Sequence, residues 1–379
     1  MDQRQDVRVV MCAPGFPASS DDADKPFLLD HAKALVACGA DVSVVSPAVH
    51  GSPSRQTIDG VKIRRVRYGP RKMETLAATG SMYREARGIK SILVIPMVIA
   101  LGIATWREAR NKSAILYGHW WIPGGLVAVV VGFVTGRPSV VHLHGSDAAV
   151  TTNKFLRTIA RRVMRAAAVR LAVSDDLASW GEELTGQKFQ VLPMPLSFDR
   201  LADPVPVPEE GFVLGVGRLV PEKGFDVLVE AVGAIELGNR PPVTIIGVGP
   251  ERENLLLLAR QLEVDLHLPG VVSPRDIGDW YSRCRLVAVP SLREGFGLVA
   301  AEAAAAGRTV VGTRVGGLPL IIDHGVSGLL VEPGDRDALA EALLAVDPLW
   351  GANGPDCVAK FNKDRHGEWL RQLFEELMI

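Results

Sequence analysis

Two glycine-rich loops carry the charged side chains on which a chemical role can be argued. The first, GVGRLVPEKG at 215–224, places Arg218 and Lys223 beside a tight turn that includes Gly217, where missing side chains let the backbone approach a ligand. Two cations there can stabilise a departing diphosphate, because fixed donors meet the negative charge that develops on it. Taken alone, this loop fits a diphosphate site and an ordinary turn with two surface cations equally well. A nicotinamide fingerprint would need a third glycine where Val220 stands, so that motif fails.

The second loop, PSLREGFG at 290–297, leads directly into an alanine-rich helical run. Its glycines leave backbone N–H groups exposed where that helix begins, at the positive end of the helix dipole. Glu294 lies in the loop, and Glu302 lies a little over one turn into the helix. A carboxylate can accept two hydrogen bonds from vicinal hydroxyls, so Glu302 suits a ribose and Glu294 suits a sugar ring.

The chain also resembles a known family. The segments that carry the resemblance are VGRLVPEKGFDVLVEA, IIGVGPERENL, VPSLREGFGLVAAEAAAAG and VGTRVGGLPLIIDHGVSGLLVEPGD. In order and spacing they are similar to the second domain of retaining GT-B glycosyltransferases of family 4, whose signature is a Glu, seven residues and a second Glu. Weaker matches in the first half are HWWIPG from His119 and HGSD from His144.

The resemblance implies a role for individual residues. Arg218 and Lys223 would contact the diphosphate of a nucleotide sugar, Glu294 the donor sugar and Glu302 the ribose. His144 matches a first-domain histidine that faces the donor sugar, and it joins Arg218, Lys223 and Glu294 as an expected catalytic residue. Further donor contacts would come from Gly217, Gly295, Phe296, Gly297, Leu298 and Val299.

The nucleotide base and the acceptor are less well encoded. The resemblance places the base near 270–274, at Gly270 and Val272, where backbone contacts would hold it. The expected acceptor-side residues are His119, Asp147 and Gly15, with Asp147 ordering its own loop. The implied mechanism is a front-face transfer in which the leaving phosphate oxygen accepts the acceptor's proton and Glu294 orients and stabilises charge.

Two positions depart from the family pattern. Many relatives carry a Gly-Gly loop after the first strand, whereas this chain has Pro14-Gly15-Phe16-Pro17. After Gly316-Gly317 the usual Pro-Glu is replaced by a proline and Leu320, which removes a carboxylate. The diphosphate and sugar positions are intact, so activity is still expected.

No metal is expected at the site. Asp22-Ala-Asp24 and Asp335-Arg-Asp337 formally match an Asp-x-Asp motif, but the first lies in an acidic loop and Asp335 is predicted to be a helix N-cap. Two cations and a helix N-terminus can replace a metal in stabilising the leaving diphosphate. His142 and His144 share one strand face, yet no third ligand lies nearby in sequence beyond Asp147. His324 and His366 are expected at the surface.

The elements around these loops predict two α/β domains. Strand-like and helical runs alternate, as in VRVVMCAP, FLLDHAKALVACGA and DVSVVSP, which is typical of a doubly wound parallel sheet. A proline-rich acidic linker near 196–210 separates the halves. We therefore expect an acceptor-side Rossmann-like domain over 1–198 and a nucleotide-sugar-binding one over 199–358, facing across a cleft. A final helix at about 359–379 would return to the first domain.

Charge is distributed unequally between the halves. Residues 1–175 hold 24 Lys and Arg against 13 Asp and Glu, whereas 176–379 hold 18 against 30. A basic run over 62–90 lies directly before an apolar run over 92–104. The cationic residues of the basic run are Lys62, Arg64, Arg65, Arg67, Arg71, Lys72, Arg84, Arg87 and Lys90. A second basic cluster comprises Lys154, Arg157, Arg161, Arg162 and Arg165. Basic charge beside an apolar face suits docking on an anionic membrane that holds a lipid-linked acceptor, although ordinary solvated charge is the simpler interpretation.

Other features narrow the class of protein. The uncharged segment 113–136 is interrupted by His119, Pro123 and glycines, so it is predicted to be a strand, a turn and a helix instead of a membrane span. Scattered cysteines without a CxxC pair fit a reducing cytosol, with peripheral attachment to the inner face of the membrane. Nucleic acid is not an expected partner, because aromatic residues are 6% of the chain and none interleaves the basic clusters.

These observations favour a cytoplasmic, metal-independent, retaining glycosyltransferase of the hexosyltransferase type. It would move a sugar from a nucleoside diphosphate sugar to an acceptor hydroxyl in cell-surface polysaccharide or glycolipid synthesis. Two alternatives stay open at this point. One is a non-catalytic nucleotide-sugar-binding protein, supported by the altered first loop and Leu320. The other is an NAD(P)-dependent oxidoreductase, which the failed fingerprint disfavours.

Overall fold

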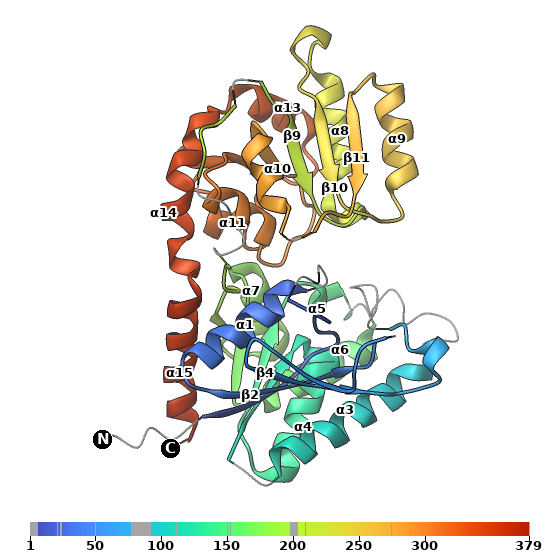
Figure 1. Cartoon of the computed structure of the whole chain (residues 1–379), viewed down its shortest axis with the longest axis vertical. Helices are drawn as coiled ribbons and strands as arrows, with labels where there is room; N and C mark the ends of the chain where they lie inside the picture. The colour runs from blue at the N-terminus through green and yellow to red at the C-terminus, as the bar shows by residue number, and fades with distance from the viewer. Residues whose placement is uncertain are drawn as a thin grey trace. The chain divides into compact units, whose positions relative to one another are not determined.

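The computed structural model describes residues 7–20, 22, 25–49, 51–76, 92–110, 113–149, 151, 153–197, 204–208, 210–273 and 275–378. The chain divides into two compact units (Figure 1). The N-terminal unit comprises Met1–Pro195 with Lys363–Ile379, and the C-terminal unit comprises Leu196–Asn362. The boundaries expected from the sequence, 198/199 and about 359, lie within a few residues of these positions.

A largely parallel sheet forms the centre of the N-terminal unit. Its strand order is β3-β4-β2-β1-β5-β6-β7-β8, and among these strands β3 alone is antiparallel to its neighbour. The order changes direction between β1 and β5, which is where open parallel sheets bind ligands. The strands are β1 (Arg8–Cys12), β2 (Asp41–Pro47), β3 (Arg55–Ile58), β4 (Val61–Val66), β5 (Ile115–His119), β6 (Ser139–Leu143), β7 (Val169–Ala172) and β8 (Gln190–Val191).

Helices cover both faces of this sheet, and successive residues of β1 point to opposite cores. Val9 and Met11 pack with residues of α1 and α15, whereas Val10 and Cys12 pack with residues of α3 and α4. Figure 1 shows α3 beside α4 and α1 beside α15. The helical segments are α1 (Pro26–Ala37), η1 (Arg71–Met73), α3 (Val94–Ala109), η3 (Trp120–Gly125), α4 (Leu126–Thr135), α5 (Ser146–Ala149), α6 (Lys154–Ala166), α7 (Asp175–Thr185) and α15 (Lys363–Met378).

Strands β3 and β4 were not foreseen, because the sequence there was interpreted as a basic surface run. The hairpin signal was present: Asp59 and Gly60 join the two strands, with φ of 48° and 82°, as two-residue hairpin turns require. On β4, Val61 and Ile63 are buried while Lys62 is exposed. Alternation of buried and charged residues was therefore the sequence signal of this strand, which lies next to the edge strand β3.

The C-terminal helix packs on the N-terminal unit, as expected. Gly367 of α15 lies so close to the Ala34 carbonyl and the Cys38 thiol of the α1 region that a side chain there would clash. The expectation that His366 is at the surface is wrong, because α15 buries one face through its residues at positions 366, 370, 373 and 374. This spacing is the sequence signal of a helix face packed on a core.

The C-terminal unit is a second parallel sheet, with order β11-β10-β9-β12-β13-β14. The order changes direction between β9 and β12, which places the two glycine-rich loops at that point. Its strands are β9 (Val213–Val216), β10 (Val243–Ile246), β11 (Leu266–Gly270), β12 (Leu286–Val289), β13 (Val310–Thr313) and β14 (Gly328–Val331). Its helical segments are η5 (Pro221–Lys223), α8 (Phe225–Ala234), η6 (Leu237–Asn239), α9 (Arg252–Gln261), α10 (Ile277–Arg283), α11 (Leu298–Ala305), α12 (Leu318–Ile321), α13 (Arg336–Ala345), η7 (Pro348–Asn353), α14 (Gly354–Val358) and η8 (Ala359–Phe361).

The uncharged segment 113–136 folds as predicted, into β5, η3 and α4. Among the described residues, no helix has both the length and the apolar character needed to cross a bilayer. The expected N-cap at Asp335 is confirmed, because its side chain accepts a hydrogen bond from the Ala338 N–H at 2.9 Å. Asp24 of the other Asp-x-Asp match lies outside the described residues.

Candidate functional site

The two glycine-rich loops of the C-terminal unit are tied together by their backbones. The N–H groups of Leu292 and Arg293 donate to the Glu222 carbonyl at 2.9 and 3.2 Å. Gly224, with φ of 64°, packs against the Pro290 carbonyl where a side chain would clash. The loops after β9 and β12 therefore form one surface at the point where the strand order changes direction.

An ion pair lies at the centre of that surface. Lys223 Nζ donates to Glu294 Oε2 at 2.7 Å, and Ser291 Oγ donates to the same oxygen at 3.0 Å. The Gly295 N–H donates to Glu294 Oε1 at 3.1 Å. Burial alone would raise the pKa of Glu294, but the Lys223 charge and these hydrogen bonds outweigh it and hold the pKa below its usual value. The structure thus brings together a cation and a carboxylate that lie 71 residues apart in sequence.

Arg218 and Glu302 have different surroundings. Arg218 follows β9 and is exposed, and within the described ranges no ion pair involves it. Glu302 is half-buried on α11 and accepts a hydrogen bond from the Tyr281 hydroxyl at 3.1 Å. Arg218 is therefore available to an anion, whereas Glu302 is held in place by Tyr281 of α10.

The remaining donor-side positions lie around the start of α11 and the end of β11. Gly297, with φ of 97°, precedes α11 and supplies no side-chain cap for Leu298 and Val299. Phe296 is buried with its ring 4.9 Å from that of Phe361. Gly270 ends β11, and Val272 is half-buried in the loop after it; Pro274 lies outside the described residues.

The two departures from the family pattern have structural consequences. Leu320 is half-buried in α12, and the loop before this helix contacts the site loop, because the Gly317 N–H donates to the Gly295 carbonyl at 2.9 Å. Gly15 is buried in the loop after β1. Arg65 holds that loop by donating to the Phe16 and Pro17 carbonyls at 3.0 and 2.6 Å.

In the N-terminal unit, Asp147 orders the loop after β6, as expected. Its carboxylate accepts the His144 N–H at 2.6 Å and the Trp121 N–H at 2.7 Å. Burial raises the pKa of Asp147 to about 7, against the opposing effect of these backbone N–H groups. The side chain is 1% exposed. Asp147 thus links the end of β5 to the end of β6.

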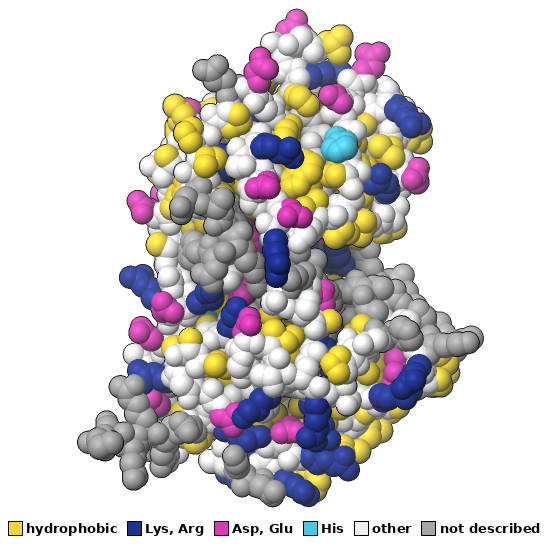
Figure 2. All heavy atoms as spheres, viewed as in Figure 1, with side chains coloured by type: hydrophobic (Ala, Val, Ile, Leu, Met, Phe, Trp, Pro, Cys, Tyr) yellow, Lys and Arg dark blue, Asp and Glu magenta, His cyan; other side chains and the backbone are white. Residues whose placement is uncertain are grey.

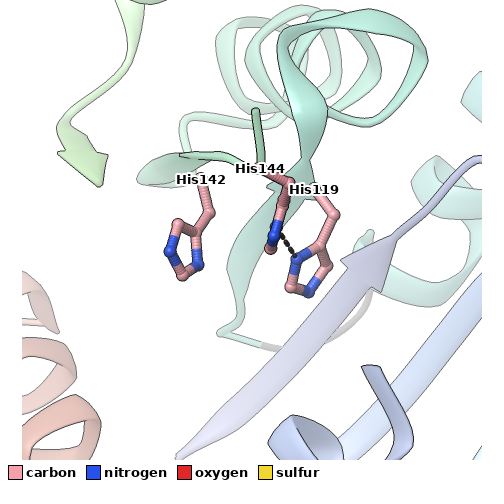
Figure 3. Close-up of side chains that lie close together, drawn as sticks. All are labelled: His119, His142 and His144. Atoms are coloured by element: carbon pink, nitrogen blue, oxygen red, sulfur yellow. Dashed lines mark hydrogen bonds between the residues drawn. The ribbon is translucent and has the colours of Figure 1, made fainter. Parts of the chain in front are cut away.

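A histidine cluster lies where those strands end. His119 and His142 are register partners on β5 and β6, and His144 comes two residues after His142. The rings of His119 and His144 meet at 2.8 Å between Nδ1 and Nε2 (Figure 3). Sequence proximity gives His142 and His144 no third histidine, but the parallel pairing of two strands brings His119 beside them.

Three further side chains join this cluster and were missed from sequence. Tyr117 contacts His142 at 2.8 Å between Oη and Nδ1, and His31 contacts His366 at 2.8 Å between Nδ1 and Nε2. Burial lowers the pKa of every histidine in the cluster, to about 3 for His142 and His366. Histidines at strand ends were the available signal, but their convergence depends on strand order.

Comparison with known proteins identifies the family. The model of glycosyl transferases group 1 matches residues 200–346, and that of the glycosyl transferase 4-like domain matches residues 25–197. The chain belongs to this glycosyltransferase family. It is a nucleotide-sugar-dependent glycosyltransferase with two Rossmann-like units of the GT-B type, as the sequence indicated, and the oxidoreductase alternative is therefore wrong.

Three similar proteins illustrate the relationship. The D-inositol 3-phosphate glycosyltransferase of Corynebacterium jeikeium is 40% identical over 190 residues, which cover 45% of each chain. The sucrose-phosphate synthase structure from Thermosynechococcus elongatus has a TM-score of 0.81 at 20% identity and covers 98% of this chain and 99% of its own. The Anabaena HepE structure in complex with UDP-glucose has a TM-score of 0.73 at 18% identity, covering 97% and 99%.

Proposed function

We propose that this glycosyltransferase transfers a sugar from a nucleoside diphosphate sugar to an acceptor hydroxyl, with retention of configuration and without a metal. The observation that carries the proposal is the contact of Lys223 with Glu294 where the strand order of the C-terminal sheet changes direction. A cation and a buried, ionised carboxylate at one loop surface offer donors to a diphosphate and acceptors to sugar hydroxyls.

The diphosphate would be bound by side-chain and backbone donors together. Arg218 is exposed on the loop after β9, and Lys223 keeps ammonium hydrogens beyond the one it gives to Glu294. The N-terminus of α11 adds backbone N–H groups, because its N-cap residue Gly297 has no side chain to cap them. These fixed donors stabilise the departing nucleotide without metal help.

Glu294 is proposed to orient the donor sugar and stabilise positive charge that develops on it, not to form a covalent bond. Its lowered pKa keeps it ionised at neutral pH. Glu302 is proposed to contact the ribose, and Gly270 with Val272 to contact the base. On the N-terminal unit, His144 is proposed as a catalytic residue, with His119, Asp147 and Gly15 on the acceptor side.

Donor binding tests the proposal most directly. A bound ligand raises the melting temperature in proportion to its affinity, so a panel of UDP, GDP and ADP sugars should give one strong shift. A UDP-sugar is the donor we expect, because HepE binds UDP-glucose. Glu294→Gln should weaken the shift, whereas Arg260→Ala, an exposed cation on α9, should leave it unchanged. No shift with any donor would contradict the proposal, and a shift without transfer or donor hydrolysis would favour a non-catalytic binding protein.

We further propose that the acceptor is reached at an anionic membrane surface. Ile95, Ile99 and Ile103 form an exposed stripe along α3, and Phe133 of α4 is 90% exposed. Helix α4 contacts both α3 and α6. Lys154, Arg157, Arg161, Arg162 and Arg165 are all exposed on α6 and make no ion pair within the described part of the chain. Figure 2 shows Lys and Arg side chains close to the hydrophobic ones at the base of the molecule.

The basic run from Lys62 contributes less to such a surface than its sequence suggested. Lys62, Arg64 and Arg67 pair with Asp41, Glu108 and Glu74, at 2.6, 3.0 and 3.4 Å. Arg65 is 3% exposed and holds the loop after β1. Arg84, Arg87 and Lys90 lie outside the described residues. Helix α6 is therefore the stronger candidate for contact with anionic lipid.

Vesicle sedimentation separates this membrane proposal from ordinary surface charge. Vesicles rich in phosphatidylglycerol should sediment the protein at low salt, and neutral vesicles should not. Phe133→Asp and the pair Arg161→Glu with Arg162→Glu should each reduce binding, while Arg260→Glu should not. Absence of binding to anionic vesicles at low salt would contradict the membrane proposal and leave the donor proposal unaffected.

A further inference from the structure

The histidine cluster of the N-terminal unit includes His144 and His119, to which the proposed function gives roles, but that function does not account for three histidine rings in one place. His119, His142 and His144 each offer a ring nitrogen, and the three atoms lie within 4.8 Å of one another. His119 and His142 are fully buried, and His144 is half-buried. The rings come from neighbouring strands that fix their backbones in register (Figure 3). Three imidazoles are thus preassembled on one rigid edge of the sheet.

The existing hydrogen bonds leave this cluster incomplete. His142 Nε2 donates to the Leu192 carbonyl at 2.9 Å, so its Nδ1 carries a lone pair that accepts the Tyr117 hydroxyl. His119 Nδ1 shares one hydrogen with His144 Nε2. Among the described residues, the other nitrogen of His119, Nε2, is buried without a hydrogen-bond partner, and so is Nε2 of the neighbouring His31. The protein itself therefore does not satisfy every buried polar atom of this cluster, which is costly.

We propose that His119, His142 and His144 bind a transition-metal dication of the Zn²⁺ type. Neutral imidazole is its common ligand, and three histidines with an open fourth position suit tetrahedral zinc. Zn–N bonds of about 2.0–2.1 Å place the nitrogens of such a site roughly 3.3 Å apart. The 2.8 Å contact of His119 with His144 would open slightly, and the wider separations would close.

The protonation of the cluster suits this role. Burial lowers the pKa of all three histidines, so each ring is neutral and keeps a lone pair at neutral pH. Each neutral ring carries a single hydrogen, which must lie on the nitrogen that does not bind the metal, so the hydrogen shared by His119 and His144 moves to an outer ring nitrogen. Binding therefore changes tautomers without a net loss of protons. His142 would bind through Nδ1 and release the Tyr117 hydroxyl, keeping its bond to Leu192.

Occupation of this site has a consequence for catalysis that rests on the proposed function. A metal on His144 removes the lone pair and the freedom of a residue proposed to be catalytic. Zinc would therefore inhibit an enzyme whose reaction needs no metal, and a chelator would restore activity. The site would be a regulatory one, distinct from the ion pair of the C-terminal unit.

Cobalt binding tests the site without relying on activity. Chelator-treated protein titrated with Co²⁺ should show the intense visible absorption of a tetrahedral ion, with one ion bound per chain and displacement by Zn²⁺. His119→Gln and His142→Gln should each weaken binding by about 100-fold or more. His324→Gln, an exposed histidine of the C-terminal unit, should change nothing. Equal binding by wild type and His119→Gln, or a spectrum of octahedral ions alone, would overturn the proposal.

A second variant guards against loss of the fold as an explanation. Tyr117→Phe keeps the ring but removes the hydroxyl that competes for His142 Nδ1, so Co²⁺ should bind several-fold more tightly. Unchanged or weaker binding would contradict the assignment of His142 as a ligand. Failure of the proposed function would be seen separately: Co²⁺ would still bind, but no sugar donor would stabilise the protein or be turned over.

Discussion

Both units carry candidate functional residues where neighbouring parallel strands end, but the side chains gathered there differ in charge. In the C-terminal unit the loops after β9 and β12 bring Lys223 and Glu294 into an ion pair. In the N-terminal unit the ends of β5 and β6 bring together His119, His142 and His144, all neutral. The loops of the C-terminal unit are suited to stabilising charge, and the strand ends of the N-terminal unit offer the lone pairs of neutral rings.

The difference follows from what holds each set of side chains. Glu294 stays ionised because a cation and three hydrogen bonds offset its burial. Within the described part of the chain the histidine rings have no carboxylate among their hydrogen-bond partners, and burial therefore keeps them neutral. A buried charge at the end of a strand needs an opposite charge or hydrogen bonds beside it. Neutral rings, by contrast, can be buried together if the strands hold them in register.

Lys223→Ala should have the largest effect, because it removes one of the two cations of the proposed donor site. Turnover should fall by about 100-fold or more if Lys223 stabilises the departing diphosphate. Steady-state kinetics with the donor found by the thermal panel would measure this loss, with Arg260→Ala as the matched surface control.

The ion pair also has a structural role that must be separated from catalysis. Lys223→Ala leaves Glu294 buried without its cation, so some loss of stability is expected as well. The double variant Lys223→Ala with Glu294→Gln removes the unpaired charge and should recover stability but not turnover. Wild-type turnover in Lys223→Ala would contradict the proposed role of this lysine.

In the N-terminal unit, replacing the buried carboxylate of Asp147 should disorder the loop after β6. Asp147→Ala leaves the N–H groups of His144 and Trp121 buried without an acceptor, which should cost about 2 kcal/mol or more. Asp147→Asn keeps one acceptor oxygen and should lose less. Hydrogen exchange should show faster opening at the ends of β5 and β6 and no change in the C-terminal unit. Equal protection in all three proteins would mean that Asp147 does not order this loop.

Much of this comparison could be predicted from sequence, but unequally for the two units. Lys223 and Glu294 stand in glycine-rich loops between clear strands and helices, where charged residues at strand ends indicate a ligand site. The parallel strands themselves were evident as continuous apolar runs. Both loops of the C-terminal site could therefore be located before their contact was known.

The histidine cluster could not be predicted in the same way. His31, His119 and His366 lie on three elements far apart in the chain, and they meet only because β5 pairs with β6 and α15 packs on α1. Strand pairing and helix packing belong to the tertiary structure, so the sequence pattern of a single element does not reveal them. Strand β4 was missed for a different reason, because its charged residues hid the alternation of buried Val61 and Ile63.

The pH dependence of stability should distinguish the ion pair from simple burial. With its lowered pKa, Glu294 binds a proton less readily when folded, so it stabilises the protein above its ordinary pKa and loses this as pH falls through the lowered value. Lys223→Met removes the main influence that lowers the pKa of Glu294, so burial should raise this pKa above the ordinary value of a glutamate.

The sign of the Glu294 contribution should then reverse in the variant. Stability would be favoured at low pH and would decline as pH rises through the raised pKa. Denaturant unfolding across pH 3 to 7 would measure both curves, taking Lys223→Met with Glu294→Gln as the reference. Parallel curves for wild type and Lys223→Met would show that the lysine does not control this carboxylate.

The smallest expected effects come from helix caps, one in each unit. Asn153 accepts the Phe155 N–H at the start of α6, and Asp335 accepts the Ala338 N–H at the start of α13. Replacing either by Ala should lower the free energy of unfolding by about 1 kcal/mol. Sugar transfer by Asp335→Ala should equal that of wild type with or without a chelator, because the Asp-x-Asp match there is a cap. Loss of metal-dependent activity in Asp335→Ala, with stability unchanged, would instead identify Asp335 as a metal ligand. The proposed donor site would then use a metal too, and it would no longer differ in this respect from the histidine site.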